Sequence, residues 1–259
     1  MSRPAPVAPR GPPDGCFDWT IKIANNWFFL LCRFSATVAT NPQRPFQRTT
    51  MYIPAHFAET RLVELHRIIR DNPLGMLVTH GSEGLDADHI PLEFDGSVGA
   101  HGALIGHLAR ANTLWQRCPT GTQVMVVFRG TDAYISPNWY PSKHETHRQV
   151  PTWNYEVVHA HGTITVHDDE RFARRVVARL TRRHEASEPK PWKMGDSEPE
   201  FIDNMLQKIV GFEIAITSLV GKVKFSQNRE ARDRLGAADA LDARGHQVIA
   251  QGMRALGGS

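Results

Sequence analysis

The chain has 259 residues, a formal net charge of +3 and 41% hydrophobic residues, which is typical of a globular protein large enough to bury a core. Residues 1–50 hold six Lys or Arg against two acids, whereas residues 51–259 hold 24 against 25. The near-neutral body therefore gives no electrostatic argument for a nucleic-acid partner. Cys118 is the one cysteine of residues 51–259, which excludes an internal disulfide framework there and favours a cytoplasmic location.

Residues 1–50 differ from the rest in composition. Their Pro-rich start is typical of disorder, and the apolar run WFFLLC (27–32) is too short to span a bilayer. A signal peptide with a cleavage region at 35–39 is the alternative interpretation, although the polar lead is long and an arginine interrupts the apolar run. We interpret residues 1–50 as a disordered or non-native extension, with Met51 as a natural start.

The first half of the body begins with a helix and continues as short strands joined by turns. The helix spans 55–73, with Leu62, Leu65 and Ile69 on its apolar stripe. Strands are predicted over 74–79, 87–94 and 102–108, then a short helix over about 110–117, then a hairpin of 122–129 and 133–136.

The second half contains the longest strand signal, 153–167, with Val158, Ala160 and Ile164 on its apolar face. The later elements are a helix ending at 184, a helix over 198–209, a strand over 211–225 broken at Gly221, and helices over 228–240 and 244–256. Consecutive strands with inserted helices predict a mainly β (α+β) protein, a β-barrel with peripheral and C-terminal helices, rather than a doubly wound sheet.

Two stretches suggest a binding site for a flat anionic ligand. In GHLARANTLW (106–115), a strand end meets a predicted helix start, so backbone N–H groups, Arg110 and Asn112 could hold a phosphate; an ordinary surface helix is the alternative. The aromatic side chains of the other stretch could line a slot for a planar ring, or pack as core. These are Trp139, Tyr140, Trp153 and Tyr155, with Asn138 and Asn154 as partners for the ring edges.

Three further patterns have weaker functional interpretations. His159 and His161 share a strand face, and Glu145 with His144 or His147 could join them, but spacing fixes no third ligand, so no metal site is predicted. The Arg-rich helix 171–185 is either a solvated face or a contact for DNA phosphates. In KVKFSQNRE (222–230), Lys222, Lys224 and Arg229 could add charge near a phosphate, although a helix capped by Ser226 or Asn228 is the favoured interpretation. Catalytic signatures such as a nucleophile elbow or Walker loop are absent from the sequence.

Seven motifs in order resemble the PaiB family, described as FMN-binding negative transcriptional regulators with a split β-barrel. They are MYIPAHF (51–57), IIRDNPLGMLVT (68–79), HIPL (89–92), GHLARANTLW (106–115), YISPNWYPSK (134–143), VPTWNYEVVHAHG (150–162) and VKFSQNR (223–229). The resemblance covers residues 51–259 and leaves out 1–50. It implies a split-barrel domain over 51–259, including C-terminal helices at 226–259, related to the pyridoxamine-phosphate-oxidase-like flavin-binding folds.

The resemblance also implies a homodimer with flavin mononucleotide (FMN) in a groove between subunits. The implied contacts are His89, Ile90 and Pro91 beside the ring, the joint formed by His107, Leu108, Ala109, Arg110 and Asn112 for the phosphate, and Trp153, Asn154 and Tyr155 as the ring-side wall. The expected role is negative transcriptional regulation, with DNA as a candidate partner, no membrane association and no catalytic residues. A flavin-dependent oxidoreductase is the alternative, and a haem-utilising relative is a third hypothesis.

Overall fold

An antiparallel sheet of eight strands organises residues 51–256, which the computed structural model describes. The predicted extension, and the signal peptide weighed against it, lie outside these residues. The strands are β1 (Ala58–Glu59), β2 (Leu74–Gly81), β3 (Gly84–Pro91), β4 (Glu93–Asp95), β5 (Ala103–Ala109), β6 (Gln123–Ile135), β7 (Thr152–His167) and β8 (Ile209–Lys224). Their order in the sheet is β3-β2-β6-β7-β8-β5-β4, and β1 pairs with β8.

The sheet curls into a barrel that is split on one side. Asn112 Nδ2 donates to Asp88 Oδ1 at 2.9 Å, and Arg117 Nη2 donates to Asp86 Oδ2 at 2.7 Å, so the segment after β5 is joined to β3 by side chains. In the described residues, β3 and β5 are not paired by backbone hydrogen bonds. The prediction of a mainly β split barrel with peripheral helices is therefore confirmed.

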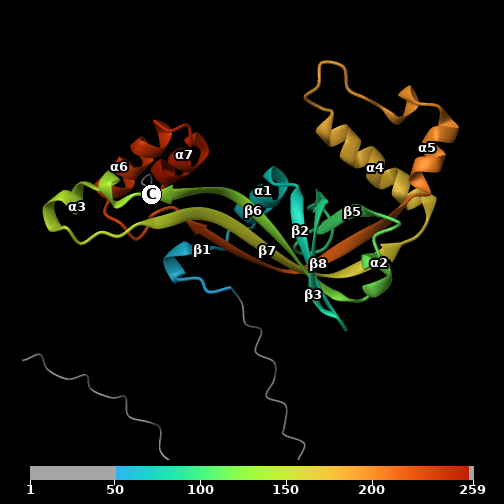
Figure 1. Ribbon diagram of the computed structural model, residues 1–259, viewed down its shortest axis with the longest axis horizontal. Helices are drawn as coiled ribbons and strands as arrows, with labels where there is room; N and C mark the ends of the chain where they lie inside the picture. The colour runs from blue at the N-terminus through green and yellow to red at the C-terminus, as the bar shows by residue number, and fades with distance from the viewer. Residues whose placement is uncertain (1–50, 257–259) are drawn as a thin grey trace, which may run out of the picture. The chain divides into compact units, whose positions relative to one another are not determined.

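Helices lie at both ends of the long strands β6, β7 and β8 (Figure 1). The helices are α1 (Leu62–Asp71), α2 (Leu114–Arg117), α3 (Pro141–Thr146), α4 (Glu170–His184), α5 (Pro199–Leu206), α6 (Ala231–Asp242) and α7 (Gln247–Ala255), with 3-10 turns at Ala55–Phe57, Pro137–Trp139 and Met194–Asp196. At one strand end lie α3, α6 and α7, and at the other α4 and α5 (Figure 1). Each end thus has its own helical cap.

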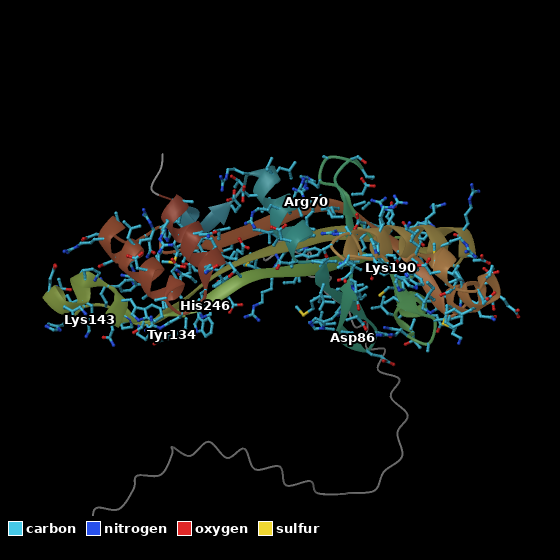
Figure 2. The ribbon with its side chains drawn as sticks, turned by 90° about the horizontal axis from the view of Figure 1, so that it is seen from above. Arg70, Asp86, Tyr134, Lys143, Lys190 and His246 are labelled. Carbon is cyan, nitrogen blue, oxygen red and sulfur yellow. The ribbon has the colours of Figure 1, made fainter. Side chains whose placement is uncertain are left out.

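Alternation along the strands separates an inner from an outer face of the sheet. Val126, Phe128 and Val158 point inward and pack with Ile68 and Ile69 of α1 in the barrel core. A second core lies inside the far end, where side chains of β6 meet α6 and α7; it includes Ile135, Phe225, Leu241, Ile249 and Met253. Figure 2 shows Arg70 of α1 and Tyr134 of β6 on opposite sides of the long strands, so α1 covers only the inner face.

The outer face of β2 and β6 belongs to none of the core clusters formed by the described residues. Met76, Val78, Met125 and Val127 lie there, half-buried, as cross-strand neighbours. On β3, Leu85 of the same sheet is 76% exposed. An apolar sheet face of this extent without a covering helix is a typical contact surface between proteins.

Several of the predicted boundaries are wrong. The strand predicted over 87–94 is divided between β3 and β4, and the helix predicted from residue 55 begins only at Leu62, after a 3-10 turn and β1. The predicted hairpin 122–136 is one strand, β6, with a β-bulge between Arg129 and Asp132 that takes up the turn-forming residues. The predicted break at Gly221 does not occur, because β8 runs through it to Lys224. There, a Cβ would lie 2.1 Å from Leu65 Cδ2, so the glycine allows α1 to approach the strand closely.

The helix predicted to start at Arg110 begins only at Leu114 and has four residues. Asn112 forms the preceding turn, where its Oδ1 accepts from Leu114 N at 2.9 Å. Nor is Ser226 or Asn228 the cap of the next helix, because α6 follows Glu230. Ser226 instead lies buried, with a φ of 64°.

Candidate functional site

The predicted contacts on β3 and β5 lie in different environments. On β3, His89 and Pro91 are exposed on the outer face, whereas Ile90 is buried in the barrel core. On β5, Leu108 is also core and Ala109 is exposed. His107 is partly buried, its Nδ1 has no hydrogen-bond partner among residues 51–256, and burial lowers the pKa of its imidazole. The β3 and β5–α2 segments do meet, through Asn112 and Asp88.

Arg110 is engaged by protein groups. Its Nη2 and Nη1 donate to the carboxylate of Asp168 at 2.5 and 3.1 Å, and its Nε donates to Gln207 O at 2.7 Å. Nη2 also donates to Ile209 O at 3.1 Å. The ion pair raises the pKa of Arg110 and lowers that of Asp168. With most of its five N–H groups used, Arg110 acts as a clamp between the end of β5, the start of β8 and the approach to α4.

Trp153 and Tyr155 lie together on the outer face of the sheet. They line a hollow of about 330 Å³ with Val127, Arg129, Asp132 and Val157. Trp153 is 53% exposed, and its ring lies edge-on to Tyr134 with 6.1 Å between centroids. Two flat aromatic side chains beside valines form a surface suited to a planar ring.

The other predicted wall residues do not reach this hollow. Asn154 is fully buried on the inner face, where its Nδ2 donates to Ser226 Oγ at 2.9 Å. Tyr140 is fully buried in the second core, and Trp139 packs against that core beneath the guanidinium of Arg244. Of the four aromatic residues that the sequence offered as a slot, two are core, as the alternative interpretation held.

The hollow and Arg110 lie at opposite ends of the same strand. Tyr155 pairs with Lys224 at the end of β8, while Arg110 N donates to Lys208 O just before β8 begins. The 16 residues of β8 span roughly 50 Å at about 3.3 Å per residue. A mononucleotide is far shorter, so the predicted phosphate contact and the predicted ring wall cannot share one ligand within a single chain.

Lys222 and Lys224, for which a phosphate contact was the less favoured interpretation of the sequence, lie beside the hollow. Lys222 pairs across the strands with Val157, and Lys224 with Tyr155, so both lysines share the outer face with the hollow. Lys222 Nζ lies 5.3 Å from the centre of the Tyr155 ring. Burial, together with Lys222 and Arg229, lowers the pKa of Lys224. The stretch KVKFSQNRE indicated a cationic segment, but the sequence alone did not show that this segment pairs with Tyr155 and Val157 of β7.

Other predicted features have structural explanations. In α4, Arg174 pairs with Glu170 and Asp203, Arg179 with Asp95, and Arg183 with Glu93. The other arginines of the predicted basic face, Arg171, Arg175 and Arg182, are exposed and form no ion pair within the described residues. The described residues contain no cluster of three metal-ligating side chains. His159 is partly buried on the outer face, and burial lowers its pKa. No helix in residues 51–256 is long and apolar enough to cross a membrane.

A split barrel with an aromatic hollow beside two lysines defines a candidate binding protein for a flat, negatively charged molecule. The chain belongs to the family described as "Putative FMN-binding domain", whose model matches residues 51–218. It is 31% identical to "Protease synthase and sporulation protein PAI 2" of Bacillus subtilis over 191 residues, 74% of this chain and 89% of that protein. These findings confirm the predicted PaiB-like family and support a flavin as the ligand class.

The chain is also similar to two further proteins. An uncharacterised protein of Aspergillus fumigatus is 31% identical over 243 residues, covering 76% of this chain and 93% of that protein. Among solved structures, the FAD and heme binding protein of Mycobacterium smegmatis aligns with a TM-score of 0.47 and 16% identity, over 70% of this chain and 79% of that one. This structural likeness is too low to carry a conclusion about function.

Proposed function

We propose that this protein is a homodimeric, cytoplasmic, FMN-binding split-barrel protein that acts as a negative transcriptional regulator. The observation that carries the proposal is the hollow of Trp153 and Tyr155 on an uncovered sheet face, with Lys222 and Lys224 beside it. Family membership supports FMN as the particular flavin. The B. subtilis relative bears the name of a sporulation protein, which suits a regulatory role.

The side chains present fit the two chemical ends of FMN. Trp153 and Tyr155 offer aromatic surface to the ring system, while Val127 and Val157 exclude water from beside it. The lysines offer ammonium donors to an anionic end. A bound flavin would supply a redox-active, coloured group, and the chain's own residues would hold it on the sheet.

The uncovered outer face supports the proposed homodimer. Met76, Val78, Met125 and Val127 form a half-buried apolar strip that no helix of the described residues covers. Packing this strip against a second copy would remove apolar surface from water.

The absorbance spectrum of the purified full-length protein tests the proposal. We expect a flavin band near 450 nm, or its appearance with saturable binding when FMN is added, together with a dimer in sedimentation. A colourless protein that does not take up FMN would refute it. Bleaching by NAD(P)H with turnover on an acceptor would instead favour the oxidoreductase alternative.

The regulatory part needs a separate measurement. Arg171, Arg175 and Arg182 are exposed on α4 and form no ion pair within the described residues, so we expect any DNA contact of that helix to go through them. Binding to DNA should then be titrated at several salt concentrations, since contacts with phosphates weaken steeply as salt rises. A salt-independent response, or none, would assign repression to a protein partner.

A further inference from the structure

Lys222 and Lys224 form a small cationic surface, which we name the lysine pair. Lys222 is only 9% exposed, and its Nζ donates to the carbonyl oxygen of Tyr52 at 3.2 Å. Its ammonium lies 5.9 Å from the ring centre of Tyr52 and 5.3 Å from that of Tyr155. Lys224 Nζ donates to Thr152 Oγ1 and lies 5.9 Å from the ring of Phe57. Each ammonium thus retains donors that these neutral partners do not use.

The lysine pair has no counter-charge among the described residues. Neither lysine takes part in an ion pair, and neither does the nearby Arg229, which donates to the amide oxygen of Gln149. Most other engaged cations of the chain are matched with carboxylates: Arg61, Arg67, Arg110, Arg117, Arg129, Arg174, Arg179, Arg183, Arg232 and Arg254.

Burying a charge without a partner is costly, and the cost falls when an anion binds beside it. Two ammonium groups on one strand face, with Arg229 close enough to act on Lys224, repel one another until such an anion is present. The aromatic rings around the lysines are neutral and cannot supply that charge. The lysine pair is therefore suited to bind a ligand with a concentrated negative charge.

We propose that the lysine pair, rather than Arg110, binds the phosphate of the flavin whose ring occupies the hollow. This inference rests on the proposed function. Tyr155 is the link between the two parts, because it lines the hollow and its ring also contacts the ammonium of Lys222. The lysines on β8 are neighbours of the hollow residues on β7, at the strand spacing of about 4.8 Å. Ring and phosphate then lie on adjacent strands of one chain.

The test compares FMN with riboflavin, which has the same ring and no phosphate. Full-length protein freed of flavin is titrated with each ligand, and binding is followed by flavin fluorescence. We expect the wild type to bind FMN at least about 10-fold more tightly than riboflavin, because hydrogen bonds to a charged group add that much. Lys224→Gln should reduce FMN affinity about 10- to 100-fold and leave riboflavin affinity unchanged, and Lys224→Arg should restore most of the preference.

Matched variants distinguish the lysine pair from other cations. Lys190→Gln removes an exposed lysine from the loop after α4 and should change neither affinity. Arg110→Gln should also leave the ratio of FMN to riboflavin affinity intact. Lys222→Met, checked by circular dichroism for native folding, is the second variant and should reduce FMN affinity in the same way.

Each outcome bears on a distinct claim. Equal wild-type affinities for FMN and riboflavin would overturn the assignment of the phosphate to the lysine pair, while flavin binding itself would stand. Loss of the FMN preference in Arg110→Gln, with Lys224→Gln unaffected, would return the phosphate to the β5–α2 joint. Failure of the wild type to bind either ligand would overturn the proposed function itself, and the lysine pair with it.

Discussion

Trp153 and Asn154 are consecutive residues of β7 whose side chains lie on opposite faces of the sheet. Trp153 is 53% exposed and lines the outer hollow, whereas Asn154 is fully buried against Ser226. The family resemblance had implied that both belong to one ring-side wall. The pleat of the strand separates them, so their substitutions should have different effects.

Trp153→Ala should weaken riboflavin and FMN binding alike, by about 1–3 kcal/mol, because it removes an aromatic surface from the ring. Its effect on unfolding should be small, since the side chain is half exposed. Fluorescence titration and urea unfolding measure the two quantities. An unchanged affinity for both flavins would remove the hollow as the ring site.

Asn154→Ala should do the reverse. It leaves Ser226 Oγ without its buried amide donor, which costs about 1–3 kcal/mol of unfolding free energy. Flavin affinity, measured below the unfolding transition, should stay within about twofold of wild type, a difference of less than ~0.5 kcal/mol. A large loss of affinity with unchanged stability would place Asn154 in the site after all.

Arg110→Gln tests the clamp at the opposite end of β8. The pKa of Asp168 lies below its ordinary 3.8 because Arg110 donates to it, so the pair stabilises the fold above that pH and the effect is lost as pH falls through the lowered value. We expect the variant to lower Tm by no more than about 4 °C at pH 7, since both side chains are exposed. Thermal melts at pH 7 and at successively lower pH should show the difference between variant and wild type shrinking as pH falls through the lowered pKa of Asp168.

Arg67 and Glu156 form a partly buried ion pair whose disruption should be more costly. Arg67 Nη2 donates to Glu156 Oε2 at 2.8 Å, and Glu156 is only 3% exposed. Arg67→Met would leave that carboxylate buried without its partner, and we expect a loss of about 2–3 kcal/mol, below the range for a fully buried pair because Arg67 is partly solvated. The double variant Arg67→Met/Glu156→Gln should recover part of this in urea unfolding. No recovery would show that Arg67 stabilises through Glu64 and Asp71 instead.

The preference for FMN over riboflavin should depend on pH through Lys224. Burial, Lys222 and Arg229 place the pKa of Lys224 below its ordinary 10.5. Only the protonated ammonium attracts a phosphate, so the preference should fall as pH rises through the lowered pKa of Lys224. Lys224→Arg should keep its preference at pH 9.5, because a guanidinium stays charged there. A flat wild-type profile up to pH 10 would argue against Lys224 as a phosphate contact.

The sequence by itself located β2, β5, β7 and β8, most of the helices and the family, because these depend on local periodicity and on motifs in order. It missed β1, which lies within the predicted helix 55–73, and it joined β3 and β4 into one strand. Alternation in 153–167 correctly placed Val158, Ala160 and Ile164 in the core. The same local patterns wrongly predicted a turn within β6 and a break at Gly221. The turn-forming residues of β6 form a β-bulge, and Gly221 allows the close approach of α1. Tertiary packing overrides local preference at such positions.

Only the tertiary structure decided which polar and aromatic residues lie together. Strand register set Lys222 and Lys224 beside Tyr155, although nearly seventy residues separate them in sequence. The tertiary structure also pairs Arg110 with Asp168, and it separates Arg110 from Trp153 by the length of β8. Long-range pairing of strands creates these neighbours, and a single sequence carries no local signal of register, which depends on side chains far along the chain.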